Sequence, residues 1–243
     1  MAIRSLVQLL DAARKSSRPA FVVDLKRRSP RDGELIPEEH FDSYVRAVVE
    51  SGVEALSMPT DAVHFGGSIE LGRRVRAMCD LPLLRKEFFT SVEQIDESRR
   101  AGFDAVQLSL STIPDLGLLR RMWRRAERIG VEVVLGVHGP AQLRVALRLG
   151  ASVIGLNNRD IAALELDEGS VAGGAALLAT VPEQLLVISE SGMRSASDVA
   201  SASCAGADAL MIGTAVAKST DPPALLRELR DATLRCGTGP GAR

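Results

Sequence analysis

The chain has 243 residues, of which 46% are hydrophobic and 25% charged, and its formal net charge is -1. The length fits one domain of barrel size, about 250 residues, and the near-neutral charge excludes the strongly basic class of nucleic-acid-binding proteins. No apolar run approaches the roughly 20 residues that cross a bilayer, and no long apolar segment follows the first methionine, so we expect a cytoplasmic protein without a membrane partner. The three cysteines, Cys79, Cys204 and Cys236, are expected to be reduced thiols.

The predicted elements alternate between helices and short apolar strands along the chain. A helix is predicted at Leu6–Lys15, within an N-terminal extension of residues 1–18, and a strand follows at Ala20–Leu25. Five later segments repeat one pattern, in which a helix ends in glycine and an apolar run follows, as in Ala101–Val106. These five strands centre on Leu56, Val106, Val134, Ile154 and Leu210, and two more are predicted at Leu83–Lys86 and Leu186–Ser189. The helices between them are predicted at Glu38–Ser51, Ser91–Ala101, Leu118–Ile129, Ala141–Leu149, Ala196–Ala205 and Pro223–Arg235.

Strand and helix units that alternate every 20–30 residues or so are typical of an α/β fold with a parallel sheet. Eight such units in a chain of this length predict a single (β/α)8 TIM barrel over residues 1–243, and no linker divides the chain. The glycine-rich end, residues 236–243, is predicted to be a disordered tail. An open doubly wound sheet is the alternative, and we rank it lower because no Gly-x-Gly-x-x-Gly follows the first strand.

Charged side chains occupy several predicted strand ends, where barrels of this kind carry their chemistry. Asp24 and Lys26 lie two residues apart at the end of the first strand, so their side chains point the same way. Lys86 ends the third strand, Arg159 follows the sixth and Glu190 the seventh. Three cations at one mouth predict an anionic small-molecule substrate, although each cation alone is more typical of a solvated loop. Glu190 is interpreted either as the partner of a lysine in catalysis or as half of a structural ion pair.

The loops after the last two strands predict a phosphate site. Ser191-Gly192 follows the seventh strand, Gly213-Thr214 follows the eighth, and each pair is followed by the start of a helix. Barrels often bind phosphate through backbone N–H groups at these two positions. Without a family resemblance, Gly213 could simply be a turn glycine, so the spacing alone favours phosphate only slightly.

Several short motifs, taken in order, resemble those of the indole-3-glycerol phosphate synthase family. They are Lys26-Arg27-x-Ser29-Pro30, Thr60-Asp61 with Phe65-Gly66-Gly67-Ser68, Leu81–Phe88, Asn157-Asn158-Arg159-Asp160 and Glu190-Ser191-Gly192. That family closes a carboxyphenylamino-deoxyribulose phosphate onto its own aromatic ring, with loss of carbon dioxide and water, and uses no metal or organic cofactor. The resemblance implies a carboxy-lyase of tryptophan biosynthesis, and we expect a monomer or weak homodimer that binds a sugar phosphate.

The resemblance also implies a role for each candidate residue. Lys86 would be the general acid that protonates the ketone oxygen, and Lys26 would bind the anthranilate carboxylate and assist proton transfer. Asp24 and Glu190 would be the catalytic carboxylates. The substrate-binding residues would be Ser29, Phe88, Asn157 and Arg159, and the phosphate-binding residues would be Ser191, Gly192, Gly213 and Thr214. A lysine and a carboxylate on opposite sides of the substrate suit a reaction that builds charge on an oxygen and on a ring.

Two positions depart from the family pattern. The segment Val134–His138 resembles a strand whose family pattern, VLVEVH, supplies a catalytic glutamate where this chain has Gly136. Asp24 stands where the family usually has glutamate. Loss of a general acid–base group typically costs about 10²–10⁴-fold in rate. Three hypotheses stay open: a divergent enzyme in which Glu190, Asp24, His138 or water replaces the missing base, a relative redirected to another phosphorylated carboxylate, or an inactive sugar-phosphate-binding barrel.

Overall fold

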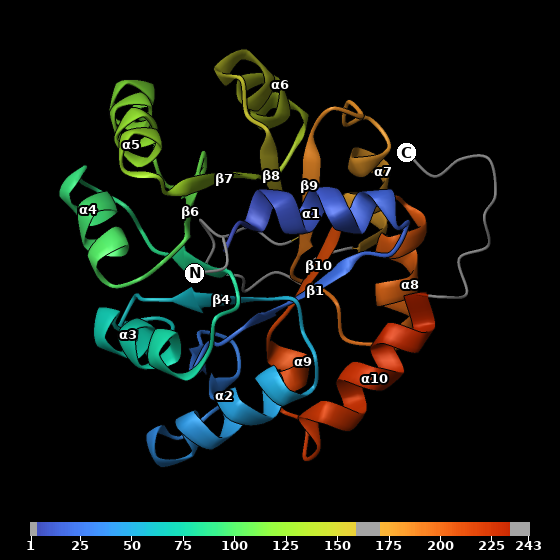
Figure 1. Cartoon of the computed structure of the whole chain (residues 1–243). Helices are drawn as coiled ribbons and strands as arrows, with labels where there is room; N and C mark the ends of the chain where they lie inside the picture. The colour runs from blue at the N-terminus through green and yellow to red at the C-terminus, as the bar shows by residue number, and fades with distance from the viewer. Residues whose placement is uncertain (1–3, 159–170, 234–243) are drawn as a thin grey trace.

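Eight parallel strands form a closed barrel in the computed structural model of this chain, which describes residues 4–158 and 171–233 (Figure 1). Around the barrel the strands follow the order β1, β10, β9, β8, β7, β6, β5, β4, and β1 closes the ring by pairing with β4. Their bounds are β1 Ala20–Asp24, β4 Ala55–Pro59, β5 Leu83–Lys86, β6 Ala105–Ser109, β7 Glu132–Val137, β8 Val153–Asn157, β9 Leu186–Glu190 and β10 Ala209–Ile212. This topology confirms the predicted (β/α)8 barrel.

Helices surround the barrel on its outside (Figure 1). They are α2 Phe41–Glu50, α3 Ile69–Met78, α4 Glu93–Arg100, α5 Leu116–Ile129, α6 Pro140–Leu149, α7 Val171–Leu178, α8 Ala196–Cys204, α9 Thr214–Ala217 and α10 Pro222–Thr233. Asp115 begins α5 by accepting a hydrogen bond from the Gly117 N–H at 2.7 Å. Gly130, with a left-handed φ of 68°, ends α5 just before β7, as the helix–glycine–strand pattern predicts.

The sequence patterns do not predict α3, and the structure gives the reason. This helix contains three arginines, and only Leu71, Gly72 and Val75 are buried, so its apolar stripe is thin. The patterns also do not predict the short hairpin after β1, formed by β2 (Arg28–Ser29) and β3 (Gly33–Glu34), or the 3-10 helix η1 (Glu38–His40). Strands of two residues carry no alternation that a sequence pattern could reveal.

The N-terminal helix α1, Leu6–Lys15, has the predicted bounds and lies across the N-terminal end of the barrel (Figure 1). Leu6 and Leu10 are buried in one apolar cluster with inward-facing residues of the strands, such as Val22. Glu132, at the start of β7, accepts a hydrogen bond from the Leu6 N–H at 2.7 Å and so anchors the first turn of the helix. Because α1 closes this end, the open mouth of the barrel lies at the C-terminal ends of the strands.

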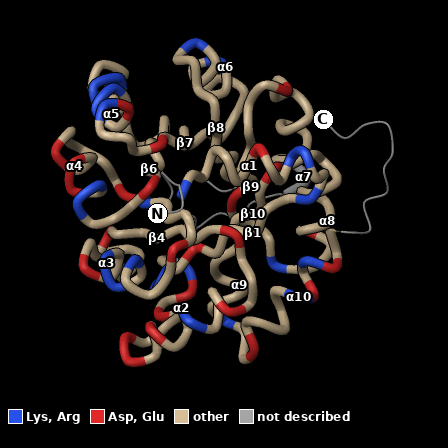
Figure 2. The backbone as a smooth tube through the Cα atoms, viewed as in Figure 1, with Lys and Arg blue, Asp and Glu red and all other residues tan. Residues whose placement is uncertain are grey.

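Figure 2 shows basic residues concentrated along α5, and all of them are arginines. Within the described ranges, no helix is long and apolar enough to cross a membrane. Cys79 is a free thiol, but Cys204 is disulfide-bonded, so the expectation of three reduced cysteines is wrong. An odd number of scattered cysteines does not exclude a bonded pair. Cys236 and the predicted tail, residues 236–243, lie outside the described residues.

Candidate active site

The inward-facing side chains near α1 are apolar, whereas those at the mouth of the barrel are polar. On β1, Val22 belongs to the apolar cluster beneath α1, and Asp24 is the next residue on the same face. On β9, Ile188 and Glu190 follow the same order. Asp24 is only 6% exposed and Glu190 is fully buried. Strand alternation therefore directs both carboxylates into the mouth of the barrel, as predicted from their places at strand ends.

Glu190 is held by two side chains from β5 and β6. Lys86 Nζ lies 3.2 Å from Glu190 Oε2, and Gln107 Nε2 donates to both carboxylate oxygens at 3.0 Å. Gly155 leaves room for this carboxylate, because a Cβ there would lie 2.0 Å from Glu190 Oε1. A fully buried carboxylate requires such partners. Gln107 is not among the predicted site residues, although a glutamine inside the apolar run of β6 is a signal that the sequence offers.

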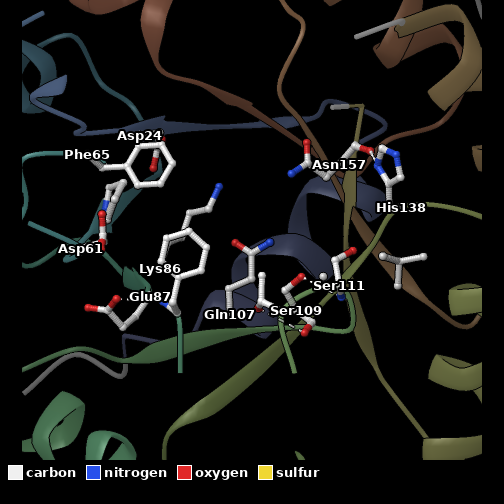
Figure 3. Close-up of a pocket in the computed structure, with 15 residues that line it drawn as sticks. Asp24, Asp61, Phe65, Lys86, Glu87, Gln107, Ser109, Ser111, His138 and Asn157 are labelled. Atoms are coloured by element: carbon white, nitrogen blue, oxygen red, sulfur yellow. Dashed lines mark hydrogen bonds between the residues drawn. The ribbon is translucent and has the colours of Figure 1, made fainter. Parts of the chain in front are cut away.

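One cavity extends from Lys86 across the ends of β5, β6 and β7 (Figure 3). One wall is aromatic, because the rings of Phe65 and Phe88 stack with centroids 6.3 Å apart. Behind this wall, His64 meets Phe88 edge-on with centroids 5.7 Å apart. The remaining lining includes Gln107, Ser109, Ser111, Thr112, Gly136, His138 and Asn157. Flat aromatic groups stack on rings such as these, so this cavity suits a substrate with a planar end.

A second cavity lies over the loops that follow β9 and β10. All four predicted phosphate residues line it: Ser191, Gly192, Gly213 and Thr214. Five cationic residues join them: Lys26, Arg31, Lys86, Arg194 and Lys218. Ser191 has a left-handed φ of 64°, a conformation that costs a non-glycine residue on the order of 1–3 kcal/mol and that clusters at binding sites. The predicted site residues do not include Arg31, Arg194 and Lys218, because loop residues carry no periodic signal.

The loop after β1 is tied to the loop after β10 at this cavity. Lys218 Nζ donates to Asp32 Oδ1 at 2.6 Å, and this hydrogen bond lowers the pKa of Asp32 below its usual value. Ser29, predicted to contact the substrate, lines neither cavity. Its Oγ lies 3.3 Å from the backbone nitrogens of Arg31 and Asp32, so it organises the turn that carries both residues.

Asp24 and Lys86 line both cavities and therefore mark their junction. Ser57 Oγ donates to Asp24 Oδ1 at 2.8 Å from the neighbouring strand. Gly213 lets the loop after β10 approach, since a Cβ there would lie 3.1 Å from Asp24 Cβ. A molecule with an aromatic end and an anionic end would place its middle beside a carboxylate and an ammonium group, which are groups that exchange protons.

Gly136 lines the first cavity without contributing a side chain, as expected from the sequence. Two residues later, the Nδ1 of His138 lies 3.0 Å from the Asn157 carbonyl oxygen, so Nδ1 carries the proton. Arg159 lies outside the described residues. Within the described ranges, no group of three or more potential His, Cys, Asp or Glu metal ligands is found.

Comparisons with known proteins agree with one another. Residues 1–229 match the family model described as Indole-3-glycerol phosphate synthase. An indole-3-glycerol phosphate synthase from Thermococcus kodakarensis is 35% identical over 218 residues, which are 90% of this chain and 95% of the relative. Another from Mycobacterium ulcerans is 36% identical over 208 residues, which are 86% of this chain and 75% of the relative. The solved tryptophan synthase alpha chain of Legionella pneumophila covers 98% of this chain and 100% of its own with a TM-score of 0.68, and at 15% identity it shares the fold alone. The chain therefore belongs to the indole-3-glycerol phosphate synthase family.

Proposed function

We propose that this protein catalyses the reaction for which its family is named. It closes 1-(2-carboxyphenylamino)-1-deoxyribulose 5-phosphate onto its aromatic ring, releases carbon dioxide and water, and forms indole-3-glycerol phosphate. One observation carries the proposal: an aromatic-walled cavity and a cationic cavity meet at Lys86 and Asp24. The substrate has an aromatic end, a phosphate end and a reacting ketone between them, so its order of groups matches the order of the cavities.

The phosphate binds in the second cavity, against the backbone N–H groups of Gly192 and Thr214 and the cationic side chains around them. Fixed N–H groups and several cations together suit a phosphate dianion. The aromatic ring lies along Phe65 and Phe88 in the first cavity. Lys26, which lines the second cavity beside the junction, pairs with the carboxylate of the ring, and this pairing holds the ring near the ketone.

Ring closure forms a bond between the ring carbon that bears the carboxylate and the ketone carbon C2. As charge moves onto the ketone oxygen, Lys86 Nζ donates a proton to it and leaves an alcohol. The bond to the carboxylate then breaks, carbon dioxide leaves, and its electron pair restores the aromatic ring. Solvent then reprotonates Lys86. Asp24 takes a proton from C1 while Lys86 protonates the alcohol, which leaves as water. One proton is taken up from solvent overall.

The remaining residues position these groups. Glu190 holds the Lys86 ammonium toward the junction through their 3.2 Å contact. Asn157 and Arg159 hold polar groups of the substrate, and Ser29 acts through the turn that carries Arg31. Asp24 is one methylene shorter than glutamate, and Gly136 supplies no acid or base, so we expect slower turnover of this substrate than in relatives with both glutamates.

The test is an activity assay with purified protein and the parent substrate, monitored by indole fluorescence. Turnover is expected, and Lys86→Ala should lower kcat by at least about 10²-fold, as loss of a general acid does. Lys15→Ala, which removes an exposed lysine from α1 at the opposite end of the barrel, is the matched control and should retain full activity. Tight binding without turnover by the wild type would overturn the proposal, and undiminished activity of Lys86→Ala would remove this lysine from the mechanism.

We further propose that the protein works in the cytoplasm as a monomer or weak homodimer without a nucleic-acid partner. The near-neutral net charge of -1 supports the last point, because nucleic-acid binding draws on a strong positive charge. Size-exclusion chromatography across a concentration series, with and without added duplex DNA, tests both statements. A stable higher oligomer or a shift of the peak with DNA would contradict them.

A further inference from the structure

Asn158, which directly follows β8, is a buried polar residue that the reaction proposed above does not use. It lines neither the first cavity nor the second. Its backbone N–H donates to the Glu190 carbonyl oxygen at 2.9 Å, and its side-chain Nδ2 donates to the Ser191 carbonyl oxygen at 2.9 Å. A carbonyl oxygen only accepts hydrogen bonds, so the nitrogen of the amide must face Ser191. Asn158 therefore holds two consecutive carbonyl groups at the point where β9 ends.

The hydrogen bond to Ser191 also sets the direction of the next peptide N–H. The described peptide bonds are trans, and in a planar trans peptide the C=O and N–H groups point in opposite directions. The N–H of Gly192 consequently points away from Asn158. Ser191 and Gly192 line the second cavity whereas Asn158 does not, so this N–H is on the side of the peptide where the cavity lies.

Ser191 has a backbone conformation that depends on support from its surroundings. Its φ of 64° lies in the left-handed region, which a serine seldom occupies unless neighbouring groups hold it there. A return to a negative φ would rotate the peptide between Ser191 and Gly192 and turn the Gly192 N–H away from its present direction. The hydrogen bond from Asn158 opposes this rotation, because the Ser191 carbonyl oxygen would have to leave its donor.

Helix α7 keeps the amide of Asn158 in place from the other side. A Cβ on Gly174 would lie 1.7 Å from Asn158 Oδ1, so the helix backbone packs directly against the amide. Glycine weakens a helix interior relative to alanine, and this close approach gives the physical reason for it here. Within the described ranges, Oδ1 is buried without a hydrogen-bond partner, so the bond that the side chain contributes is the one from Nδ2 to Ser191.

We propose that Asn158 is a positioning residue for the phosphate. It holds Ser191 in the left-handed conformation and thereby keeps the Gly192 N–H directed into the second cavity. The inference rests on the proposed function, because it takes the 5-phosphate of that substrate as the group that this N–H binds. The backbone hydrogen bond from Asn158 to Glu190 does not depend on the side chain, so the side chain acts on phosphate binding and leaves the reacting groups in place.

Binding of two ligands tests the inference separately from catalysis. Both are reduced substrates in which the C2 ketone is an alcohol and closure cannot occur, and one of them lacks the 5-phosphate. By titration calorimetry, Asn158→Ala should bind the phosphorylated ligand about threefold to tenfold more weakly than the wild type, as loss of one hydrogen bond predicts. Its affinity for the unphosphorylated ligand should be unchanged. Gly139→Ala adds a Cβ with nothing within 4 Å and is the control that should retain both affinities. Equal losses for the two ligands, or no loss for either, would overturn the inference.

Further variants test whether Asn158 acts through Ser191. In a Ser191→Gly background, Asn158→Ala should weaken binding of the phosphorylated ligand by about twofold or less, because glycine adopts a φ of 64° without support. An undiminished loss in that background would overturn the inference. Gly174→Ala pushes the amide away from Ser191 and should reproduce the loss caused by Asn158→Ala, but it should add nothing to that variant, in which the clash is absent. An additive loss would overturn the role given to the amide.

Steady-state kinetics separate this inference from the proposed function. Asn158→Ala should raise KM about threefold to tenfold and leave kcat within about twofold of the wild type, since only binding is weakened. If the wild type closes the parent substrate and Asn158→Ala has an unchanged KM, the proposed function stands and the inference is overturned. If Asn158→Ala loses affinity for the phosphorylated ligand alone and the wild type closes no substrate, the inference is supported and the proposed reaction is overturned.

Discussion

Removing Lys86 should destabilise the protein, because Glu190 would lose the cation that its fully buried carboxylate faces at 3.2 Å. Removing one partner of a buried ion pair typically costs about 3–5 kcal/mol. The side chain of Lys86 is 18% exposed and Gln107 retains its hydrogen bonds to Glu190, so Lys86→Met should cost near the lower end, about 3 kcal/mol. For a chain of this size, each kcal/mol lowers Tm by about 2–4 °C. The expected drop in Tm is therefore about 6–12 °C.

Thermal denaturation measured by circular dichroism tests this number together with a double variant. Lys86→Met with Glu190→Gln removes both charges, so it should recover at least half of the lost stability. Lys15→Met, at a lysine whose side chain is 74% exposed, is the control and should change Tm by less than about 2 °C. The reasoning fails if Lys86→Met melts within about 2 °C of the wild type, or if the double variant is no more stable than Lys86→Met.

Three further outcomes are expected. Gly155→Ala forces the buried Glu190 carboxylate to move and should lower kcat at least about 10²-fold. Gly139→Ala is the control and should leave kcat unchanged, because nothing lies within 4 Å of the added Cβ. Equal activities of the two variants would contradict this prediction. Leu10→Ala leaves a cavity beneath α1 and should lower the free energy of unfolding in urea by about 2–5 kcal/mol, with KM unchanged. A raised KM would mean that the helix affects substrate binding and would contradict this prediction. The pKa of Asp32 is lowered by its hydrogen bond from Lys218, so the charged form stabilises the folded state. The stability advantage of wild type over Asp32→Asn should be complete near neutral pH, begin to fall near the unfolded-state pKa of about 4, and vanish only when the pH drops below the lowered pKa of folded Asp32. A constant difference in acid unfolding would refute this reasoning.

The barrel could be predicted from sequence because its evidence is local and repeated. Each unit carries its own helix, glycine and apolar strand, so an error in one unit leaves the others intact. α3 and the hairpin after β1 could not be predicted in this way. The helix buries only a thin stripe around Leu71 and Val75, and two-residue strands have no period.

The candidate site could also be predicted only in part, because strand-end residues follow a local pattern and the other site residues do not. Asp24, Lys86 and Glu190 could be predicted as neighbours because parallel strands bring their C-terminal ends to one rim. Gln107 was missed because its importance depends on the Glu190 carboxylate, 83 residues away in the sequence. Arg31 and the other loop cations of the second cavity depend on how loops fold over the rim, which no strand pattern encodes.

The seal that α1 forms has a consequence for how this chain can change over evolutionary time. The helix shares no side chain with either cavity, and the apolar cluster beneath it reaches the second cavity only through Met211, so the fold draws much of its cohesion from residues that lie outside the site. Exchanges of side chains at the rim can then alter selectivity while this part of the core stays the same. This separation allows residues at the mouth of the barrel to change substrate preference without prior stabilising substitutions elsewhere in the fold.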